Sequence, residues 1–346
     1  MKDTDINPIF WQDSALVLLD QRRLPAEEVW LRCTQVSEVV AAIQNMVVRG
    51  APAIGLAGAY GMVFAATAAW RHAGAQWRTA WLPEVAALRH ARPTAVNLAW
   101  AVDLMAQHAV GIHGAPAAPL LAQAQRIHAE DLAANHRMGL LGAALLGPAS
   151  RVMTHCNAGA LATAGHGTAL GVIRDGHAAG KIREVFATET RPWLQGARLT
   201  AWELARAGIP VRLITDGSAA HVLRTQGVSW VIVGADRVAA NGDVANKIGT
   251  YALAIAARAH GTRFMVVAPC STIDLATAHG EDIVIEERPA TEITTIGERA
   301  YAPAGVGAFN PVFDVTPAAL IDVLVTERGV LHHPDRGALE SLLRPL

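Results

Sequence analysis

The sequence predicts an α/β protein with a helical N-terminal domain and a C-terminal domain built on a mostly parallel sheet. Helical apolar spacing dominates the first 146 residues, whereas short β-like runs alternate with helical stretches from residue 151 onward. Such alternation is typical of a parallel sheet with helices on both faces. A chain of 346 residues is long enough for two domains, which we expect at residues 1–130 and 131–346.

The N-terminal part begins with a predicted strand at residues 15–20, and residues 21–23 form its turn. The apolar residues between 37 and 48 recur at helical spacing. Pro52 suits the first turn of the next helix, because a proline there loses no hydrogen bond. Further helices are expected at residues 79–90, 97–108 and 119–146.

The C-terminal part contains six candidate strands separated by helical stretches. The strands are expected at residues 151–155, 184–188, 211–215, 230–235, 263–268 and 282–285, and the helices at 160–173, 198–207, 218–226 and 247–260. Ligands of such sheets bind beyond the carboxyl ends of the strands, where the strand order reverses. Polar residues that directly follow a strand are therefore the candidates for function.

Composition excludes several classes of partner. The formal net charge of -1 provides no general attraction for nucleic acid or for an anionic membrane surface. The apolar stretch at residues 51–69 is rich in Ala and Gly and is interrupted by Pro52. The start of the chain is acidic and polar, and the three cysteines are far apart without metal-ligand spacing. We therefore expect a cytoplasmic protein with no nucleic-acid or membrane partner.

The first candidate for chemistry is Cys156, in the segment THCNAG that leaves a predicted strand. A thiol beside free backbone N–H groups and a helix N-terminus can have a lowered pKa or can help to hold an anionic intermediate. The ordinary explanation is a small buried apolar residue, which we assign to Cys33 and Cys270. Position and neighbours distinguish Cys156 from these two.

The second candidate is Asp236, in GADRV after the apolar run at residues 230–233. A carboxyl group at a strand end with apolar walls can have its pKa raised enough to act as an acid, although a capping role is the ordinary alternative.

Asn246 and Lys247 follow a glycine-containing loop and are expected at a helix start, where they would cradle a phosphate. Arg49, beside another helix start, would clamp the same anion or a sugar hydroxyl.

Other chemistries have little support in the sequence. His155, His166 and His177 do not form a metal-ligand pair, so no metal is expected. The chain has no GxSxG nucleophile elbow, no Walker motif and no GxGxxG fingerprint. A nucleotide-dependent oxidoreductase is therefore suggested only by the alternating fold.

Five ordered strings together resemble the methylthioribose-1-phosphate isomerase family, which also includes regulatory subunits of an initiation-factor exchange complex. They are RGAPAIG (49–55), THCNAGALAT (154–163), ETRPWLQGARLTAWEL (189–204), GADRVAANGDVANKIGT (234–250) and APCSTID (268–274). The resemblance implies a helical N-terminal domain and a Rossmann-like C-terminal domain, paired as a homodimer without cofactor or metal. It covers most of the chain, from about residue 17 to about residue 330.

The resemblance also implies an activity and a set of site residues. It implies aldose–ketose isomerisation of 5-methylthioribose 1-phosphate in methionine salvage, with Cys156 and Asp236 as the catalytic pair. The implied substrate-binding residues are Arg49, Gly50, Ala51, Arg92, Gln195, Asn246 and Lys247. The sequence leaves two alternatives open: isomerisation of another sugar phosphate, such as ribose 1,5-bisphosphate, and a noncatalytic subunit that senses a sugar phosphate or nucleotide. Retention of the catalytic pair argues against the sensor.

Overall fold

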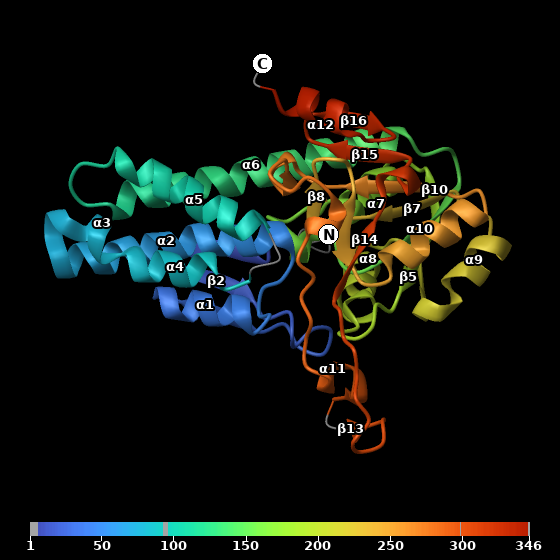
Figure 1. Cartoon of the computed structure of the whole chain (residues 1–346), viewed down its shortest axis with the longest axis horizontal. Helices are drawn as coiled ribbons and strands as arrows, with labels where there is room; N and C mark the ends of the chain where they lie inside the picture. The colour runs from blue at the N-terminus through green and yellow to red at the C-terminus, as the bar shows by residue number, and fades with distance from the viewer. Residues whose placement is uncertain (1–5, 93–95, 298, 345–346) are drawn as a thin grey trace.

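The computed structural model describes residues 6–92, 96–297 and 299–344. A helical part lies on the left of Figure 1 and a part built around a β-sheet lies on the right. Helix α6, Ala117–Ala144, joins the two, because it packs against α2 (Ala51–Ala73) and against α7 (Ala169–Ala178). The boundary expected between residues 130 and 131 falls inside α6, so the division into 1–130 and 131–346 stays a prediction.

The chain opens with an antiparallel sheet of β1 (Ile9–Gln12), β2 (Ala15–Leu19) and β3 (Trp30–Cys33). Every residue of the central strand β2 is buried, as expected of a continuous apolar run. The strand predicted at residues 15–20 is confirmed and ends one residue earlier.

Helix α2 forms the centre of the helical part and is buried almost all round from Ala51 to Ala66. The other helices of this part are α1 (Val36–Gln44), α3 (Trp77–Ala80), α4 (Leu82–Arg89) and α5 (Val96–Val110). Helix α2 approaches α5 closely at Gly55, where an added Cβ would lie 2.9 Å from the carbonyl oxygen of Asn97. A larger residue there would force the two helices apart.

Residues Ala51–Ala80 are long and apolar enough to span a membrane by length and composition. In their most apolar window, however, 83% of the residues are buried inside the protein. Helix α2 packs against α1, α4, α5 and α6, so neighbouring helices cover its apolar surface. Core packing therefore accounts for the apolar character of this segment.

The second part contains a seven-stranded sheet within the described ranges, ordered β16-β15-β10-β7-β4-β5-β6. Its strands are β4 (Ser150–Thr154), β5 (Ile182–Thr188), β6 (Val211–Ile214), β7 (Trp230–Val233), β10 (Arg263–Val267), β15 (Val323–Thr326) and β16 (Gly329–His332). All neighbouring pairs are parallel except β15 with β16. The strand order reverses between β4 and β7, as in a Rossmann-like sheet. The predicted fold class is confirmed.

Helices cover both faces of this sheet: α7, α8 (Ala201–Arg206), α9 (Ala219–Thr225), α10 (Thr250–Ala259) and α12 (Arg336–Leu343). Side chains of β7 alternate between the faces. Trp230 and Ile232 belong to the apolar cluster that includes α7, whereas Val231 and Val233 belong to the cluster that includes α9 and α10. A strand buried on both faces explains its uninterrupted apolar sequence.

A second sheet of four strands stands beside the carboxyl ends of the large sheet. It consists of β11 (Ile273–Asp274), β8 (Arg237–Ala239), β9 (Val244–Lys247) and β14 (Phe313–Thr316). The helix predicted at residues 247–260 is therefore shorter than expected, because Lys247 ends β9 and α10 begins at Thr250. Strand β9 forms because it pairs with β14, which lies more than sixty residues later in the chain.

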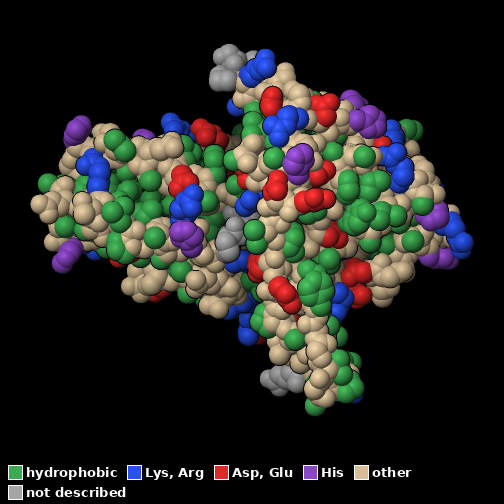
Figure 2. Space-filling view, viewed as in Figure 1, with side chains coloured by type: hydrophobic (Ala, Val, Ile, Leu, Met, Phe, Trp, Pro, Cys, Tyr) green, Lys and Arg blue, Asp and Glu red, His purple; other side chains and the backbone are tan. Residues whose placement is uncertain are grey.

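Between β11 and β14 the chain forms an arm that projects at the bottom of Figure 1. The arm carries α11 (Thr291–Thr294) and the hairpin of β12 (Thr295–Ile296) and β13 (Arg299–Ala300). The strand predicted at residues 282–285 is wrong, because Asp282 ends the 3-10 turn η6 (Gly280–Asp282) and residues 283–285 lead into the arm without forming a strand. Figure 2 shows positive and negative side chains interspersed over the visible face of both parts.

The remaining turns of helix are short. They are η1 (Gly74–Gln76), η2 (Ala160–Ala162), the π-helical η3 (Gly196–Thr200), η4 (Asp216–Ser218), η5 (Cys270–Thr272), η6 (Gly280–Asp282) and η7 (Ala318–Leu320). The helix predicted at residues 160–173 divides into η2 and α7, and only the second is α-helical. The other five predicted strands of the C-terminal part correspond to β4, β5, β6, β7 and β10.

Replacement of Gly55 by Val tests the close contact between α2 and α5. We expect the free energy of unfolding to fall by about 1–3 kcal/mol, because the new side chain meets the backbone of α5. Thermal and denaturant unfolding measure this change. The matched control Ala68→Val lies on the exposed side of the same helix and should lose well under about 1 kcal/mol. Equal losses in the two variants would contradict a packing constraint at Gly55.

Candidate active site

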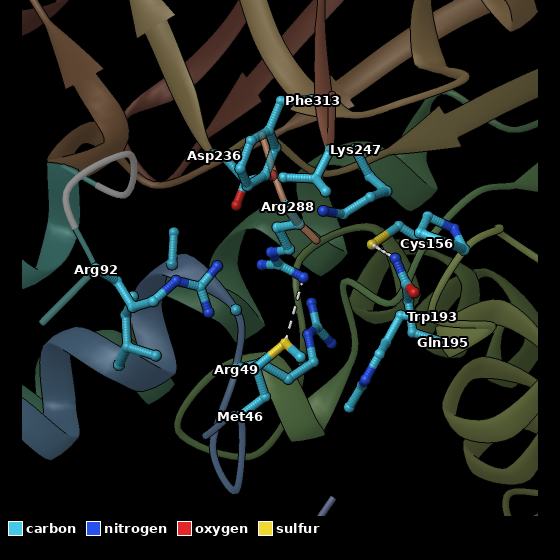
Figure 3. A pocket seen from close by; sticks show the side chains of 15 residues that line it. Met46, Arg49, Arg92, Cys156, Trp193, Gln195, Asp236, Lys247, Arg288 and Phe313 are labelled. Carbon is cyan, nitrogen blue, oxygen red and sulfur yellow. Dashed lines mark hydrogen bonds between the residues drawn. The ribbon is translucent and has the colours of Figure 1, made fainter. Parts of the chain in front are cut away.

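The carboxyl ends of β4 and β7 meet a cavity at the point where the strand order reverses. Cys156 follows β4 by two residues and Asp236 follows β7 by three, and both line a cleft of about 580 Å³. Figure 3 shows their side chains on two sides of this cleft, with Lys247 between them. The position agrees with the general rule for ligand sites in open parallel sheets.

All nine residues predicted for the site line this cleft or an inner cavity that adjoins it. Arg49, Gly50, Ala51, Arg92, Cys156, Gln195, Asp236 and Lys247 line the cleft, and Asn246 lines the inner cavity. The two cavities share Arg49, Gly50, Ala51, Cys156 and Asp236. The fold thus brings together residues from four separate sequence strings and from both parts of the molecule, while the role of each residue remains a prediction.

Arg49 reaches the site from the turn between α1 and α2. Its Nη1 donates to Oδ1 of Asn157 at 2.6 Å, and its Nη2 donates to the Asn157 carbonyl oxygen at 2.8 Å. Gly50 follows at φ +96°, and an added Cβ would lie 2.5 Å from the Cβ of Ala162. Only glycine permits both this dihedral angle and this approach. The start of α2 is therefore held directly against the Cys156 loop.

The buried carboxylate of Glu203 organises that loop. Its Oε1 accepts from Asn157 Nδ2 at 2.8 Å, and its Oε2 accepts from the backbone N–H of Ala160 at 2.8 Å. Arg174 Nη2 also donates to Oε2, at 3.1 Å. Glu203 thereby orients the amide of Asn157, which in turn holds Arg49. Sequence reasoning missed this residue, although it lies within the string at 189–204.

Cys156 is held in an uncommon backbone conformation, at φ +64°. Its backbone N–H donates to Oγ1 of Thr190 at 2.9 Å, and Gln195 Nε2 donates to its sulfur at 3.2 Å. Thr190 and Leu194 also have positive φ values, of +60° and +58°. Such strained residues persist where surrounding contacts enforce them, and they cluster at functional sites.

The predicted helix directly after Cys156 is not formed. The 3-10 turn η2 begins four residues later and α7 only at Ala169, so no α-helix N-terminus adjoins the thiol. The loop departs from helix because Glu203 binds its backbone N–H groups and Gly159 packs against Gly167.

In place of a helix N-terminus, the side chain of Gln195 contacts the sulfur of Cys156. The Oε1 of Gln195 is buried without a hydrogen-bond partner among the described residues, so it is free to accept from a ligand hydroxyl.

Asp236 occupies an environment that favours its neutral form. Burial raises the pKa of Asp236, against the opposing effect of Lys247 and of three nearby arginines. Its backbone N–H donates to the carbonyl oxygen of Ala245, which fixes the start of the β8–β9 hairpin. Ile54, Val312 and Phe313 add apolar walls to the cleft. The expected acid is therefore present in an environment that suits proton donation.

Lys247 enters the cleft from the end of β9. Its Nζ lies 4.0 Å from the centre of the Phe313 ring, and burial lowers the pKa of Lys247 to about 8. The expected position at a helix start is wrong, because Gly249 at φ +101° separates the strand from α10. Asn246, the preceding strand residue, is buried and donates through Nδ2 to Oγ1 of Thr250 at 3.0 Å.

His155 connects three elements beneath the site. Its Nε2 lies 2.8 Å from the carbonyl oxygen of Ile248, which can only accept, so the proton is on Nε2. Nδ1 then accepts from the hydroxyl of Thr188 at 2.7 Å. Burial lowers the pKa of His155, which keeps the ring neutral. We assign it to support of the loops and not to chemistry.

The cleft also contains residues that sequence reasoning missed. Arg288 lies in its centre, and Met46, Trp193 and Phe313 complete its lining (Figure 3). The signal for Arg288 was the charged run EER at 286–288. This run follows the strand expected at residues 282–285 and matches no motif that indicates a site. Throughout the described part of the chain, no three His, Cys, Asp or Glu side chains form a group that could hold a metal ion.

Comparisons with known proteins agree with this geometry. Residues 47–333 match the initiation factor 2 subunit family. Two relatives named methylthioribose-1-phosphate isomerase, from Alkalilimnicola ehrlichii and Thioalkalivibrio sulfidiphilus, are 59% and 55% identical to this chain. The first match covers 95% of each chain, and the second covers 99% of this chain and 100% of the relative. This chain belongs to the methylthioribose-1-phosphate isomerase family. The resemblance predicted from the sequence is confirmed.

Solved structures show the same fold in two differently named groups. The 5-methylthioribose 1-phosphate isomerase of Pyrococcus horikoshii is 41% identical with a TM-score of 0.88, covering 97% of this chain and 95% of that one. Subunit delta of an initiation factor from A. fulgidus is 40% identical with a TM-score of 0.85, covering 98% and 99%. Because both groups share the fold, the site itself must distinguish their activities.

Replacement of Glu203 by Gln tests the organising role of the buried carboxylate. We expect a loss of about 3–5 kcal/mol in stability, because Arg174 and the backbone N–H of Ala160 lose a charged acceptor. Denaturant unfolding measures the loss. The control Glu130→Gln removes an exposed partner of Arg126 and should change stability by no more than about 0.5 kcal/mol. A Glu203→Gln protein as stable as the control would refute this role.

Proposed function

We propose that this chain converts 5-methylthioribose 1-phosphate into 5-methylthioribulose 1-phosphate, an aldose–ketose isomerisation of methionine salvage. The names of its relatives support the reaction class and the substrate. The observation that carries the proposal is the pairing of Cys156 and Asp236 across one cleft whose other polar groups are mostly cations. Cations suit the phosphate, and the buried acid suits the chemistry that the substrate requires.

Ring opening is the first difficulty of this reaction. The anomeric carbon carries the phosphate, so the ring cannot open to a free aldehyde as an ordinary hemiacetal does. We propose that protonated Asp236 donates its proton to the ring oxygen as the bond from C1 to that oxygen breaks. The resulting carboxylate then takes the proton of the C2 hydroxyl as the ketone forms. Asp236 thus donates one proton and later accepts another, and its raised pKa is consistent with both steps.

Transfer of hydrogen from C2 to C1 has two possible routes. In the enolate route the thiolate of Cys156 removes the C2 proton and later returns a proton to C1. In the hydride route the hydrogen moves with its electron pair directly to C1, and the thiol stabilises charge. The hydrogen bond from Gln195 Nε2 to the sulfur is compatible with both. Solvent deuterium at C1 marks the first route, and retention of the substrate hydrogen marks the second.

The other residues of the cleft are proposed to hold the substrate. Arg49 and Lys247 would bind phosphate oxygens, and Arg92 would support them from the opposite side. Asn246 would bind the phosphate beside Lys247, and Gln195 would bind a sugar hydroxyl. Met46, Trp193 and Phe313 offer apolar and polarisable contacts, which suit a methylthio group better than the second phosphate of ribose 1,5-bisphosphate. The catalytic pair likewise favours the isomerase over a noncatalytic sensor.

We further propose that the enzyme is a cytoplasmic homodimer that acts without nucleic acid or a membrane. The formal net charge of -1 supports the expected lack of nucleic-acid and membrane partners, because it provides no general attraction for a polyanion. Cys33, Cys156 and Cys270 are all free thiols, which suits a reducing compartment. Light scattering during size-exclusion chromatography measures the oligomeric state directly.

The central test is turnover of 5-methylthioribose 1-phosphate followed by NMR. We expect ketose formation by the unaltered protein and a loss of at least about 100-fold in kcat for Cys156→Ala and for Asp236→Asn. Cys270→Ala and Asp103→Asn are matched controls outside the cleft and should retain activity. A folded wild-type protein without activity would refute the proposed reaction. Full activity of Cys156→Ala or Asp236→Asn would refute the assigned catalytic pair.

The pH dependence provides an independent test. A proton donor works only while protonated, so kcat/KM should fall as pH rises through the raised pKa of Asp236. Lys247 also loses its charge near pH 8, which weakens phosphate binding above that value. In Lys247→Arg the second effect should disappear, because arginine stays charged. An alkaline decline that is identical in wild type and Lys247→Arg would show that Lys247 does not contribute to it.

A further inference from the structure

Arg288 projects into the cleft from the base of the arm. Its backbone N–H donates to the carbonyl oxygen of Asn310 at 3.0 Å, and Val312 donates to the carbonyl oxygen of Glu286 at 3.0 Å. These bonds tie the two ends of the arm together beside the site. Figure 3 shows the guanidinium of Arg288 in the middle of the cleft, with Arg49, Arg92 and Lys247 around it. The arm therefore contributes a side chain to the site.

Within the described residues, the hydrogen bonds of Arg288 leave one edge of its guanidinium without a strong acceptor. Nε donates to Glu286 Oε1 at 2.7 Å, whereas Nη1 donates to the thioether sulfur of Met46 at 3.4 Å and lies 3.8 Å from a carboxylate oxygen of Glu292. Thioether sulfur is a weak acceptor. By contrast, Arg212 donates through both Nε and Nη2 to the two oxygens of Glu184, a fully paired arrangement. The free edge of Arg288 can therefore bind a ligand.

Glu286 positions two arginines at once. Its second oxygen, Oε2, accepts from Arg92 Nη2 at 3.4 Å, while Oε1 accepts from Arg288. Although burial opposes ionisation, Arg92 and Arg288 hold the pKa of Glu286 below its usual value. The Nε of Arg92 is buried without a hydrogen-bond partner among the described residues. Two guanidinium groups thus share a single carboxylate, and both retain unused donors.

The cleft consequently has more positive than negative charge. Four cations, Arg49, Arg92, Arg288 and Lys247, line the cleft together with Asp236, which burial drives toward its neutral form, and Glu286 adds one carboxylate beside Arg92 and Arg288. Burial first, and then the charge of Arg288, lowers the pKa of Arg92. Like charges in a partly buried site repel one another strongly. A dianion bound between them would relieve this repulsion and satisfy the unused donors.

We infer that Arg288 binds the phosphate group of the substrate through its free guanidinium edge, and that Glu286 is the residue that positions Arg288 and Arg92 for this contact. The identity of the substrate rests on the proposed function, whereas binding of a phosphate dianion does not. Arg288 belongs to the arm, so the arm is part of the substrate site. The fork geometry of arginine matches a phosphate in a way that lysine cannot.

Kinetics and inorganic phosphate together test this inference. For Arg288→Ala we expect KM to rise about 10- to 100-fold with kcat changed far less, because the contact is made in ground and transition states alike. The inhibition constant of inorganic phosphate as a competitor should rise by a similar factor. Arg288→Lys should recover only part of the affinity. Arg299→Ala, an exposed arginine of the same arm, is the matched control and should behave as wild type.

The positioning role of Glu286 has a test of its own. Glu286→Ala adds net positive charge to the cleft, so charge alone would strengthen phosphate binding. Loss of orientation would instead weaken it, and we expect KM and the phosphate inhibition constant to rise. A fall in both would overturn the positioning role.

Separate outcomes distinguish this inference from the proposed function. If wild type binds inorganic phosphate calorimetrically but does not turn over the sugar phosphate, the function fails, and weaker binding by Arg288→Ala still supports the inference. If Arg288→Ala and Arg288→Lys bind phosphate as wild type does, the inference is overturned whatever the activity. A loss of kcat alone, with KM unchanged, also overturns it. Thermal unfolding of each variant confirms that the fold is retained.

Discussion

The buried carboxylate of Glu203 is the contact on which the site depends. It holds Asn157 and the backbone of the following turn, and Asn157 in turn holds Arg49 across the boundary between the helical part and the sheet. An ionised group in such a place is costly unless every oxygen has partners, and here each oxygen has two. Contacts within the protein therefore hold the loop of Cys156, as a preorganised site requires.

The electrostatics of the cleft follow from the same architecture. A parallel sheet delivers Cys156 and Asp236 to one edge, and the small sheet and the arm deliver Lys247 and Arg288 above it. Burial then favours a neutral Asp236 and weakens the charge of Lys247. Carboxylates compensate the cations of the cleft only in part, which suits the anionic substrate proposed above. The neutral form of Asp236 and the lowered pKa of Lys247 thus have a common origin in desolvation.

Much of the fold could be predicted from local pattern. The apolar runs of β4, β7 and β10 are buried on both faces, so they appear as strands in the sequence. Residues that depend on distant pairing could not be assigned. Lys247 lies in a strand because β14 pairs with it, and residues 283–285 form no strand because they lead from η6 into the arm. Such pairings have no local signal.

The sequence by itself determined the family, and it supplied candidates for the catalytic pair and for phosphate binding, because these depend on the identity of residues in ordered strings. Tertiary structure alone decided which groups touch. It placed Gln195 against the sulfur of Cys156, made Glu203 the support of Arg49, and brought Arg288 from the arm into the cleft. These contacts join residues from 39 to more than 200 positions apart. They form only because the two parts of the molecule pack around one cavity, so no local periodicity of the sequence predicts them.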